Sequence, residues 1–415
     1  MNLSDDLKAR GYGEHTSSPL EEILEHKRSV YHGIDPTADS LHVGHLVPIL
    51  LMKRLMDQGH RGIFLVGGGT GMIGDPRESG ERQLLDRRTL EHNKRGIRKQ
   101  LQKIVGKRIE MVDNLSWLKK VSLIEFLRDI GKHFTVNELV KRDLIKRRLT
   151  TAEESISFTE FTYSLLQGYD FLTLFKKKGV TLQVGGSDQW TNMLSGVELI
   201  RRKEGGEAYC FTAPLITDAA GKKFGKSEGN AVWLDPQKTS PFRFYQFWVN
   251  LPDERVEEYL KVYTLMSLTE IDALLEMHGR NKAERKAQHT LALHITELVH
   301  GKAAAEQAQA ATQALFGGTS LAELKNDEKA VLLSEVETVR ISSKQLDEGY
   351  GVVDALVEGK LAGSKSDAKR LLQGKGVSLN GSVVDEETKL TQENFSGGLG
   401  LLKKGKRDAV VLVLK

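Results

Sequence analysis

The stretch SVYHGIDPTADSLHVGHLVPILLMKRLMDQG, residues 29–59, contains the pattern that decides the fold. Residues 29–35 have the composition of a β-strand, and apolar residues then recur at helical spacing from Leu46 to Met56. The next segment, 61–76, reads RGIFLVGGGTGMIGDP, a short apolar strand followed by a glycine-rich loop. The order strand, helix, strand predicts a parallel sheet covered by helices.

A second strand-to-helix pattern lies in the middle of the chain. Residues 180–190 read VTLQVGGSDQW, an apolar strand that runs into glycines, and a helix is predicted directly after them. The fold class predicted for residues 1–238 is therefore α/β, with a Rossmann-like parallel sheet. Because ligands on such sheets bind at the carboxyl ends of the strands, the segments that follow the strands form the candidate site.

The pattern changes to helices after residue 238. An α-helical domain is predicted over residues 239–320, where Ser240 and Pro241 are suited to cap and begin the first helix. Residues 321–348 are polar and weakly periodic, which favours a linker. Residues 349–415 are then expected to form a small α+β unit, which ends in the strand-like sequence DAVVLVLK.

Composition excludes several classes of protein. The chain has 415 residues, 39% of them hydrophobic, and no run of 18 apolar residues, so no membrane span is expected. The first residues, MNLSDDLKARGYG, lack the apolar core of a secretion signal, so a cytoplasmic protein is expected. A single cysteine, Cys210, rules out a disulfide framework and a multi-cysteine metal cluster. The net charge of +4 neither requires nor excludes a nucleic-acid partner.

The first candidate site is His42-Val43-Gly44-His45, at the predicted start of a helix. Two ordinary histidines one turn apart, or a metal pair, are alternative interpretations. No third ligand lies at an obvious spacing, which makes zinc a weak alternative, and no metal site is predicted. A helix N-terminus offers free N–H groups and partial positive charge, and Gly44 leaves room for a nucleotide near the backbone. The two imidazoles could then donate hydrogen bonds to phosphate oxygens.

The second candidate site is Lys223-Phe224-Gly225-Lys226-Ser227, within TDAAGKKFGKSEGN. A solvated basic loop is the alternative interpretation, and such loops are common. Frequent glycines and two lysines three residues apart favour a cationic loop that could close on a polyphosphate. Such a loop suits a reaction whose transition state carries additional phosphoryl charge.

Together these motifs resemble the class I aminoacyl-tRNA synthetases, in which KFGKS is a variant of the KMSKS motif. Four longer stretches are similar to the tyrosine-specific members of bacteria and organelles: YHGIDPTADSLHVGHL, GGGTGMIGDP, SFTEFTYSLLQGYDF and LQVGGSDQW. The resemblance covers nearly the whole chain. It implies a catalytic domain over residues 1–238 that activates L-tyrosine with ATP and then transfers it to the 3′-terminal adenosine of tRNA(Tyr). A homodimer is also implied.

A site for tyrosine needs partners for an ammonium group, a carboxylate and a phenol hydroxyl around an apolar slot. Tyr163, Gln167 and Asp170 follow one another at i, i+4 and i+7, which places them on one helix face. Their apolar neighbours weaken the alternative of a solvated helix edge. Asp75 follows the glycine-rich loop and is suited to the ammonium, although aspartates are also common in turns.

By resemblance, Tyr31 and Asp170 bind the phenol hydroxyl of tyrosine. A buried Asp–Tyr pair without that hydroxyl loses free energy, so phenylalanine is expected to be rejected. The residues implied around the α-ammonium and the carboxyl group are Asp75, Tyr163, Gln167 and Gln189.

The resemblance also implies a nucleotide site around the two short motifs. Thr37 and His42 would meet the γ-phosphate end of ATP, and Lys223, Lys226 and Ser227 would close over the leaving pyrophosphate. Magnesium would accompany ATP through its phosphates. The residues implied for the rest of the nucleotide are Asp35, Gly44, His45, Gly186 and Asp188.

The last unit, 349–415, resembles the S4 RNA-binding domain. Lys365, Lys369 and Arg370 lie near one another on a predicted short helix, which fits contacts with RNA phosphates. A solvated basic helix is the alternative interpretation. By resemblance, this unit binds an arm of the tRNA, and residues 240–315 contact the anticodon side and support a dimer.

Three other functions remain possible at this point. The same scaffold could serve tryptophan, but an indole offers one donor and no acceptor, which fits Tyr31 and Asp170 poorly. A small-molecule nucleotidyltransferase shares the H-x-G-H motif but would not need the helical region or an S4-like tail. A non-catalytic RNA-binding protein would be expected to show decayed motifs, whereas both are intact here.

Overall fold

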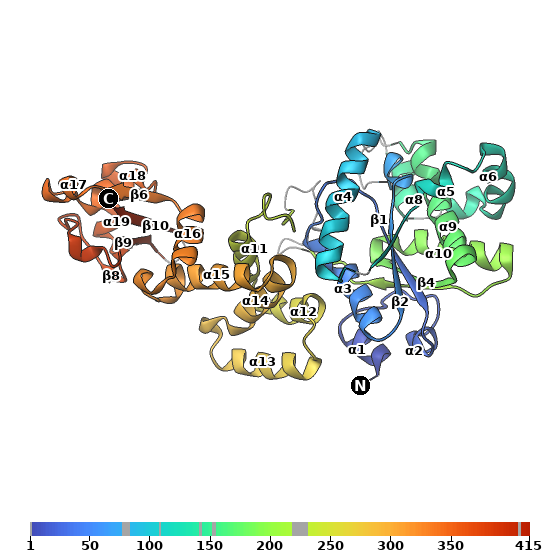
Figure 1. Cartoon of the computed structure of the whole chain (residues 1–415), viewed down its shortest axis with the longest axis horizontal. Coiled ribbons are helices and arrows are strands. Elements are labelled where there is room, and N and C mark those ends of the chain that lie inside the picture. The colour runs from blue at the N-terminus through green and yellow to red at the C-terminus, as the bar shows by residue number, and fades with distance from the viewer. Residues whose placement is uncertain are drawn as a thin grey trace. The chain divides into compact units, whose positions relative to one another are not determined.

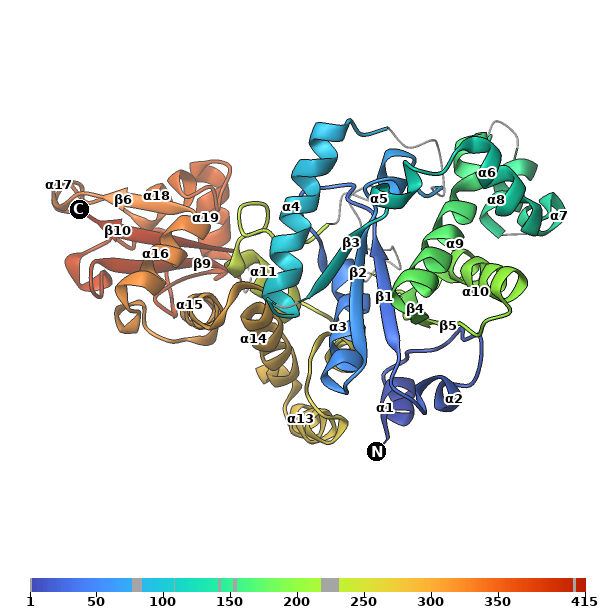
Figure 2. The same ribbon diagram turned by 45° about the vertical axis from the view of Figure 1, so that its right-hand side comes forward.

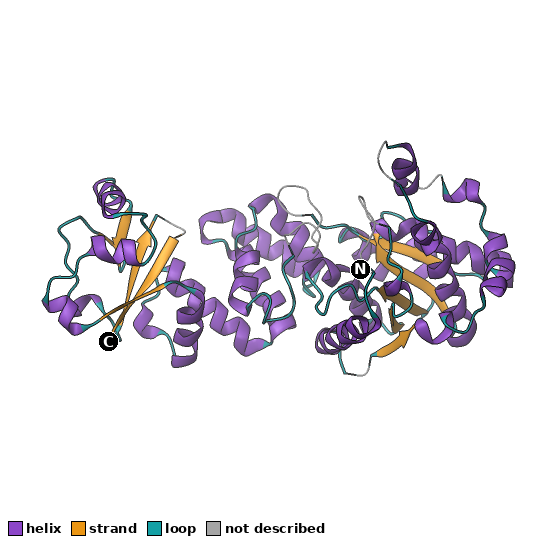
Figure 3. Cartoon of the chain, turned by 90° about the horizontal axis from the view of Figure 1, so that it is seen from above, coloured by secondary structure: helices purple, strands orange, loops and turns teal. Residues whose placement is uncertain are grey.

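The computed structural model describes two compact units, which we treat separately. Unit 1 consists of Met1–Lys238 and Leu251–Ala287, and unit 2 of Thr239–Asn250 and Gln288–Lys415. Figure 3 shows strands in two separate groups, which form one sheet in each unit. The residues that the structure describes are 2–76, 84–107, 109–140, 143–151, 155–217, 231–405 and 408–415.

Unit 1 is built on a five-stranded sheet in the order β3-β2-β1-β4-β5. All neighbouring strands are parallel. The strand order reverses at β1, so the sheet is doubly wound, and the predicted α/β class with a Rossmann-like sheet is confirmed. The strands are β1 (Ser29–Ile34), β2 (Arg61–Val66), β3 (Glu110–Asp113), β4 (Val180–Gly186) and β5 (Tyr209–Ala213).

Helices cover both faces of this sheet. Helices α3 and α4 lie on one face and α9 and α10 on the other (Figures 1 and 2). The helices of unit 1 are α1 (Leu3–Ala9), α2 (Leu20–Leu24), α3 (Val43–Asp57), α4 (Arg87–Ile104), α5 (Leu115–Leu118), α6 (Leu123–Asp129), α7 (Val136–Leu139), α8 (Asp143–Thr150), α9 (Phe158–Lys178), α10 (Trp190–Glu204), α12 (Asp253–Tyr263) and α13 (Leu268–Arg280).

Local sequence explains where α9 begins and ends. Ser157 and Glu160 form a capping box, in which each side chain binds the backbone N–H of the other residue. Gly179 ends the helix in the left-handed region at φ 64°, where glycine is tolerated best. These signals fix the rotation of the helix, so that Tyr163 and Asp170 are buried on one face.

Two buried arginines join the N-terminal segment of unit 1 to its later segment. Arg10 donates from Nη1 to the carbonyl of Lys261 at 2.8 Å and from Nη2 to that of Met266 at 2.7 Å. Arg54, on α3, donates to the carbonyl of Thr264. The last turn of α12 and the residues after it are therefore held by Arg10 and Arg54.

Gly96 lets α4 approach the loop that follows β1. A Cβ atom at this position would lie 2.0 Å from the carbonyl oxygen of Asp39, which is backbone and cannot move aside cheaply. We expect Gly96→Ala to lower the free energy of unfolding by about 1–3 kcal/mol, although alanine favours a helix. Gly279→Ala on α13 is the matched control, because its Cβ would meet nothing within 4 Å, and it should stabilise by up to ~1 kcal/mol. Thermal unfolding would measure both signs, and equal effects would contradict the close approach.

Unit 2 combines helices with a second five-stranded sheet. Ser240 caps α11 by accepting from the N–H of Arg243, and Pro241 is the first helical residue, as predicted. The helices are α11 (Pro241–Val249), α14 (Lys286–His300, whose first two residues belong to unit 1), α15 (Lys302–Thr312), α16 (Asn326–Glu335), α17 (Ser343–Asp347), α18 (Val352–Glu358) and α19 (Lys365–Gln373).

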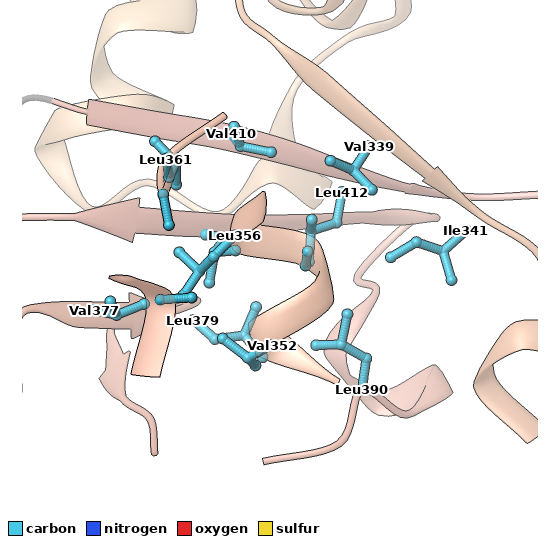
Figure 4. Packing of buried hydrophobic residues seen from close by; sticks show 14 of the residues in the cluster. Val339, Ile341, Val352, Leu356, Leu361, Val377, Leu379, Leu390, Val410 and Leu412 are labelled. Carbon is cyan, nitrogen blue, oxygen red and sulfur yellow. The ribbon is translucent and has the colours of Figure 1, made fainter. Parts of the chain in front are cut away.

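The sheet of unit 2 has the strand order β6-β10-β9-β7-β8. Strand β10 pairs parallel with β6, and the other pairs are antiparallel. Alternate residues of β10 enter two different cores: Val410 and Leu412 face the cluster of Figure 4, and Val411 packs with residues of α15 and α16. The strands are β6 (Thr338–Ile341), β7 (Val377–Leu379), β8 (Ser382–Val383), β9 (Leu399–Lys404) and β10 (Asp408–Leu414).

The segment 321–348, predicted as a linker, contains α16, β6 and α17. Val339 and Ile341 of β6 are fully buried, and Leu332 of α16 is buried in the second core. These elements are short, and each buries only a few apolar residues, which explains the weak periodicity of the sequence. The segment therefore forms part of unit 2.

Candidate active site

The candidate site lies at the carboxyl ends of the parallel strands of unit 1. Asp35 directly follows β1, and the glycine-rich loop beginning at Gly67 directly follows β2. Asp113 ends β3, and Gly186 ends β4. Because the strands are parallel, these four positions share one edge of the sheet, where ligands of such sheets bind.

Asp170, on α9, is a buried carboxyl group held by two donors. The indole Nε1 of Trp117 donates to its Oδ1 at 2.7 Å, and Nδ2 of Asn114 donates to its Oδ2 at 2.9 Å. Burial raises the pKa of Asp170 from 3.8 to about 7, while the two donors act in the opposite direction. The site therefore contains a desolvated carboxyl group whose orientation is fixed.

Tyr31, on β1, lies beside this carboxyl group. Its side chain is 1% exposed and packs edge-on against Phe171 at a ring distance of 5.1 Å. Burial, and then the charge of Asp170, raise the pKa of its hydroxyl well above the usual value, so the group stays protonated. Its hydroxyl oxygen has no hydrogen-bond partner among the described residues. A buried hydroxyl without a partner is unfavourable, and a ligand that supplies one would remove that cost.

Asp35 is the centre of a second set of hydrogen bonds. The hydroxyl of Tyr163 donates to its Oδ2 at 2.8 Å, and that of Thr70 donates to its Oδ1 at 2.7 Å. Asn114 donates to Thr70 Oγ1 at 2.9 Å, which connects this set to Asp170. A Cβ at Gly67 would lie 2.1 Å from Asp35 Oδ1, so the loop needs glycine there.

Asp75 and Gln189 are brought together from separate segments. Gln189 Nε2 donates to Asp75 Oδ2 at 2.8 Å, and Asn192 Nδ2 donates to Asp75 Oδ1 at 3.2 Å. Gln167 is half-buried on α9, one turn after the buried Tyr163. The structure thus places these predicted tyrosine-binding residues in unit 1, two of them in direct contact.

The two histidines of the first motif cap the helix that they begin. Nδ1 of His42 accepts from the N–H of Gly44, and Nδ1 of His45 accepts from the N–H of His42, each at 3.2 Å. A neutral imidazole whose Nδ1 accepts a hydrogen bond carries its proton on Nε2. In its neutral form, each ring can therefore donate a hydrogen bond from Nε2. Thr37 lies nearby in the loop, where its N–H donates to the carbonyl of Asp35 at 2.8 Å.

The segment that follows the second motif is paired with the first motif. The N–H of Val43 donates to the carbonyl of Val232 at 2.9 Å, and that of Leu234 to the carbonyl of Leu41 at 2.8 Å. These two backbone hydrogen bonds join the described segment that follows the second motif to the segment that carries the first motif. The second motif itself, with Lys223, Lys226 and Ser227, lies outside the described residues.

Gly186 ends β4 and Asp188 follows it, at the same edge of the sheet. A Cβ at Gly186 would lie 2.5 Å from Asp188 Oδ1, so the aspartate lies directly against this glycine. Asp188 is exposed, and Gly44 is half-buried at the start of α3.

Among the described residues, no group of three His, Cys, Asp or Glu side chains could hold a metal ion. No described helix is long and apolar enough to cross a membrane.

The three predicted RNA-binding cations lie in unit 2 and are exposed. Lys365 pairs with Asp354 at 2.7 Å, Lys369 with Glu386 at 3.5 Å, and Arg370 with Asp367 at 2.7 Å. Each positive charge that the sequence places on α19 is thus balanced by a carboxylate.

Sequence reasoning missed four polar residues of the site, Thr70, Asn114, Trp117 and Asn192. Asn114 directly follows β3, and Thr70 lies in the glycine-rich loop after β2. For Thr70, its position after a predicted parallel strand was the signal that could have found it, whereas β3, which precedes Asn114, was not predicted. Trp117 and Asn192 lie inside helices, and no local pattern indicates which groups they face.

Known proteins match the chain along its whole length. Residues 24–317 match the family model of tRNA synthetases class I (W and Y). Over 98% of its length, the chain is 45% identical to a tyrosine–tRNA ligase of Roseiflexus castenholzii, and the match covers 97% of that protein. Over its full length, it is 43% identical to the full-length tyrosine–tRNA ligase of Bacteroides thetaiotaomicron. Among solved structures, it is similar to a C-terminally truncated mitochondrial tyrosyl-tRNA synthetase of Aspergillus nidulans, with 31% identity, a TM-score of 0.68, and coverage of 75% of this chain and 94% of that one.

The chain therefore belongs to the class I tRNA synthetases of the tryptophan and tyrosine family. Within that family it belongs to the tyrosine–tRNA ligases, enzymes that activate tyrosine and charge tRNA with it. The expected enzyme class and the preference for tyrosine over tryptophan are thereby confirmed.

Proposed function

We propose that Tyr31 and Asp170 bind the phenol hydroxyl of tyrosine. The observation that carries this proposal is the buried Asp170 carboxyl group, held by Trp117 and Asn114 beside the Tyr31 hydroxyl. A carboxylate that already accepts two hydrogen bonds retains lone pairs for the phenol proton, and Tyr31 can donate to the phenol oxygen. An indole N–H could donate to the carboxylate of Asp170, but an indole has no acceptor for the hydroxyl of Tyr31. The pair therefore favours tyrosine over tryptophan.

We also propose that the rest of the amino acid is bound by groups on α9, on α10 and at Asp75. Asp75 would be the counter-ion of the α-ammonium, with Tyr163 and Gln167 beside it. Gln189 would lie near the carboxylate that reacts. In support of this role, hydrogen bonds from Gln189 and Asn192 orient Asp75. A carboxylate that is already oriented loses less entropy when the ligand binds.

ATP is the second substrate, and we propose that it binds at the start of α3. His42 and His45 would donate from Nε2 to phosphate oxygens at a helix N-terminus, with Thr37 at the γ-phosphate. Magnesium would be bound through the phosphates, as is usual for nucleotides. The residues proposed for the adenosine side are Asp35, Gly44, Gly186 and Asp188.

The chemistry proposed for the first step is an in-line displacement. The tyrosine carboxylate attacks the α-phosphate of ATP, its bond to phosphorus forms, and pyrophosphate leaves with the electrons of the broken bond. The carboxylate is ionised at pH 7, so no general base is required. The protein then contributes positioning and stabilisation of the phosphoryl charge.

Lys226 is the residue we expect to act most directly on the leaving group, with Lys223 and Ser227 beside it. Lys226→Ala should lower the rate of tyrosyl-adenylate formation by about 10²–10³-fold, equivalent to about 2.7–4 kcal/mol in the barrier. Stopped-flow or quench-flow measurement of adenylate formation would check this. A wild-type rate in the variant would rule out the proposed role.

The overall assignment of substrates is tested by ATP–pyrophosphate exchange. Exchange should depend on tyrosine, with tryptophan and phenylalanine far less active at equal concentration. Exchange that is as fast with tryptophan as with tyrosine would contradict the proposed roles of Tyr31 and Asp170.

For tRNA, we propose that unit 2 contacts the arm on the anticodon side. The exposed cations Lys365, Lys369 and Arg370 would exchange their carboxylate partners for RNA phosphates. Surface ion pairs of this kind contribute little to stability, so their exchange costs little. We propose a cytoplasmic location, because charging of tRNA supplies translation.

We further propose a homodimer. Large apolar side chains are exposed on α6 to α9 of unit 1: Leu123 is 70% exposed, Ile124 71%, Val136 63% and Phe158 74%. Exposed apolar residues gathered on neighbouring elements are typical of protein–protein interfaces. They favour this part of unit 1, rather than residues 240–315, as the surface for a second copy. Sedimentation equilibrium would decide, and a monomer at micromolar concentration would contradict the proposal.

A further inference from the structure

Helix α4 carries an unusual concentration of positive charge. Its 18 residues, RRTLEHNKRGIRKQLQKI, contain seven lysines and arginines against one glutamate, a net charge of +6. The whole chain has a net charge of only +4. Positive charge that serves only solubility is usually interspersed with acidic residues, so this helix needs another explanation.

The charge is arranged as a stripe on one side of the helix. Arg88, Arg95, Lys99 and Lys103 recur at spacings of seven, four and four residues, which places them on one face, and all four are exposed. The opposite face packs on unit 1 through the buried side chains of Leu90, Asn93, Ile97, Leu101 and Ile104. At 1.5 Å per residue, the stripe is about 22 Å long.

In the described part of the chain, the cations of the stripe form no close ion pair with a carboxylate, although Arg88 lies near Asp86. No ion pair within 4.0 Å joins Arg88, Arg95, Lys99 or Lys103 to an acidic side chain in the described part of the chain; the pairs of α4 involve Lys94 and His92. Partial burial and then the nearby charge of Lys99 lower the pKa of Lys103, as expected for like charges held close together. The cations of α19 differ, because each has a carboxylate partner.

The other face of α4 is fixed to the loop that leads into the first motif. Asn93 Nδ2 donates to the carbonyl of Pro36 at 2.8 Å. Gln100 accepts from the N–H of Leu41 at 2.8 Å and donates to Ser40 Oγ at 2.9 Å. The stripe therefore belongs to the same rigid part of unit 1 as the strand end that carries Asp35.

We propose that the exposed stripe of α4, defined by Arg88, Arg95, Lys99 and Lys103, binds the phosphate backbone of tRNA while its acceptor end is in the active site. This inference rests on the tRNA-charging activity. A row of exposed cations that have no close ion pair among the described residues matches a polyanion, because neutralising phosphates releases their counterions. A membrane surface is a poorer match, because the apolar face that would enter a bilayer is already buried.

The test is aminoacylation by the full-length enzyme at several salt concentrations. In Arg95→Gln/Lys99→Gln, kcat/KM for tRNA should fall about tenfold or more at low salt. The slope of log kcat/KM against log salt should flatten by about 1.4–1.8, which corresponds to two lost phosphate contacts. Tyrosine-dependent ATP–pyrophosphate exchange should stay within about twofold of wild type, which separates this inference from the proposed amino acid and ATP sites.

The matched control is Lys176→Gln/Lys177→Gln, which removes the same charge from the exposed end of α9 on the opposite face of the sheet. It should leave the tRNA kinetics and the salt slope unchanged. Unchanged kinetics in the α4 variant would overturn the proposal, and so would an equal effect in the control, which would indicate net charge alone. An equal loss of exchange and aminoacylation would also overturn it. If the first variant does not fold, Arg88→Gln/Lys103→Gln tests the two ends of the same stripe.

Discussion

In Asp170→Asn, kcat/KM for tyrosine in ATP–pyrophosphate exchange is expected to fall by about 10–150-fold, which corresponds to the 1.5–3 kcal/mol typical of a hydrogen bond to a charged group. The carboxyl group is 2% exposed and accepts from Trp117 and Asn114. An amide has one oxygen, so its NH2 group would face one of these two donors. The variant thus loses an acceptor for the phenol, and its NH2 group is placed against another hydrogen-bond donor.

Discrimination between amino acids is the sharper measurement for this prediction. Because phenylalanine has no hydroxyl to lose, its kcat/KM should change far less, and the ratio of tyrosine to phenylalanine should shrink by about the same factor. Asp129→Asn, at a half-buried position at the end of α6, is the control, and it should leave both kcat/KM values unchanged. An unchanged ratio in Asp170→Asn would show that this carboxyl group does not bind the phenol.

Arg148→Met is expected to lower the free energy of unfolding by about 3–5 kcal/mol, because it leaves a buried carboxylate without its partner. Arg148 on α8 and Glu160 on α9 are each 2% exposed, and Nη1 of the arginine lies 2.9 Å from Oε1 of the glutamate. Nη2 of the arginine also donates to the carbonyl of Ser155. The pair anchors the first turn of the helix that carries Tyr163 and Asp170.

A double-mutant cycle in urea would measure this coupling. Arg148→Met/Glu160→Leu should recover much of the lost stability, because no buried charge is then left unpaired. Arg128→Met removes an exposed pair with Asp129 and should cost less than about 1 kcal/mol. A loss below 1 kcal/mol in Arg148→Met would contradict the idea that this pair is desolvated.

Much of unit 1 could be predicted from local sequence. Apolar spacing and glycines located β1, β2 and β4 correctly, and the spacing of Tyr163, Gln167 and Asp170 correctly predicted one helix face. The residues that hold Asp170 could not be predicted, because Asn114 and Trp117 reach it from a segment more than fifty residues away. The strand that precedes them, β3, has four residues, two of them acidic, and gives no clear apolar signal.

Ion pairs between residues far apart in the chain also could not be predicted from the sequence. Lys365, Lys369 and Arg370 form a positive cluster in the sequence, but Asp354 and Glu386, which balance two of them, come from other elements. In the first motif, the pattern indicated two phosphate donors. It could not show that the same rings cap their own helix through Nδ1.

Unit 1 is made of two separate segments of the chain, which limits how the two units can be separated. The chain crosses between the units three times, after residues 238, 250 and 287, so no single cut separates an intact first unit from an intact second one. A fragment that ended at residue 238 would lack the carbonyls that Arg10 and Arg54 bind, and both cations would lose buried partners. Exchange of unit 2 between relatives by recombination would therefore need junctions near residue 288, with α11 kept compatible. The two units are thus interleaved along the chain, although each has a core of its own.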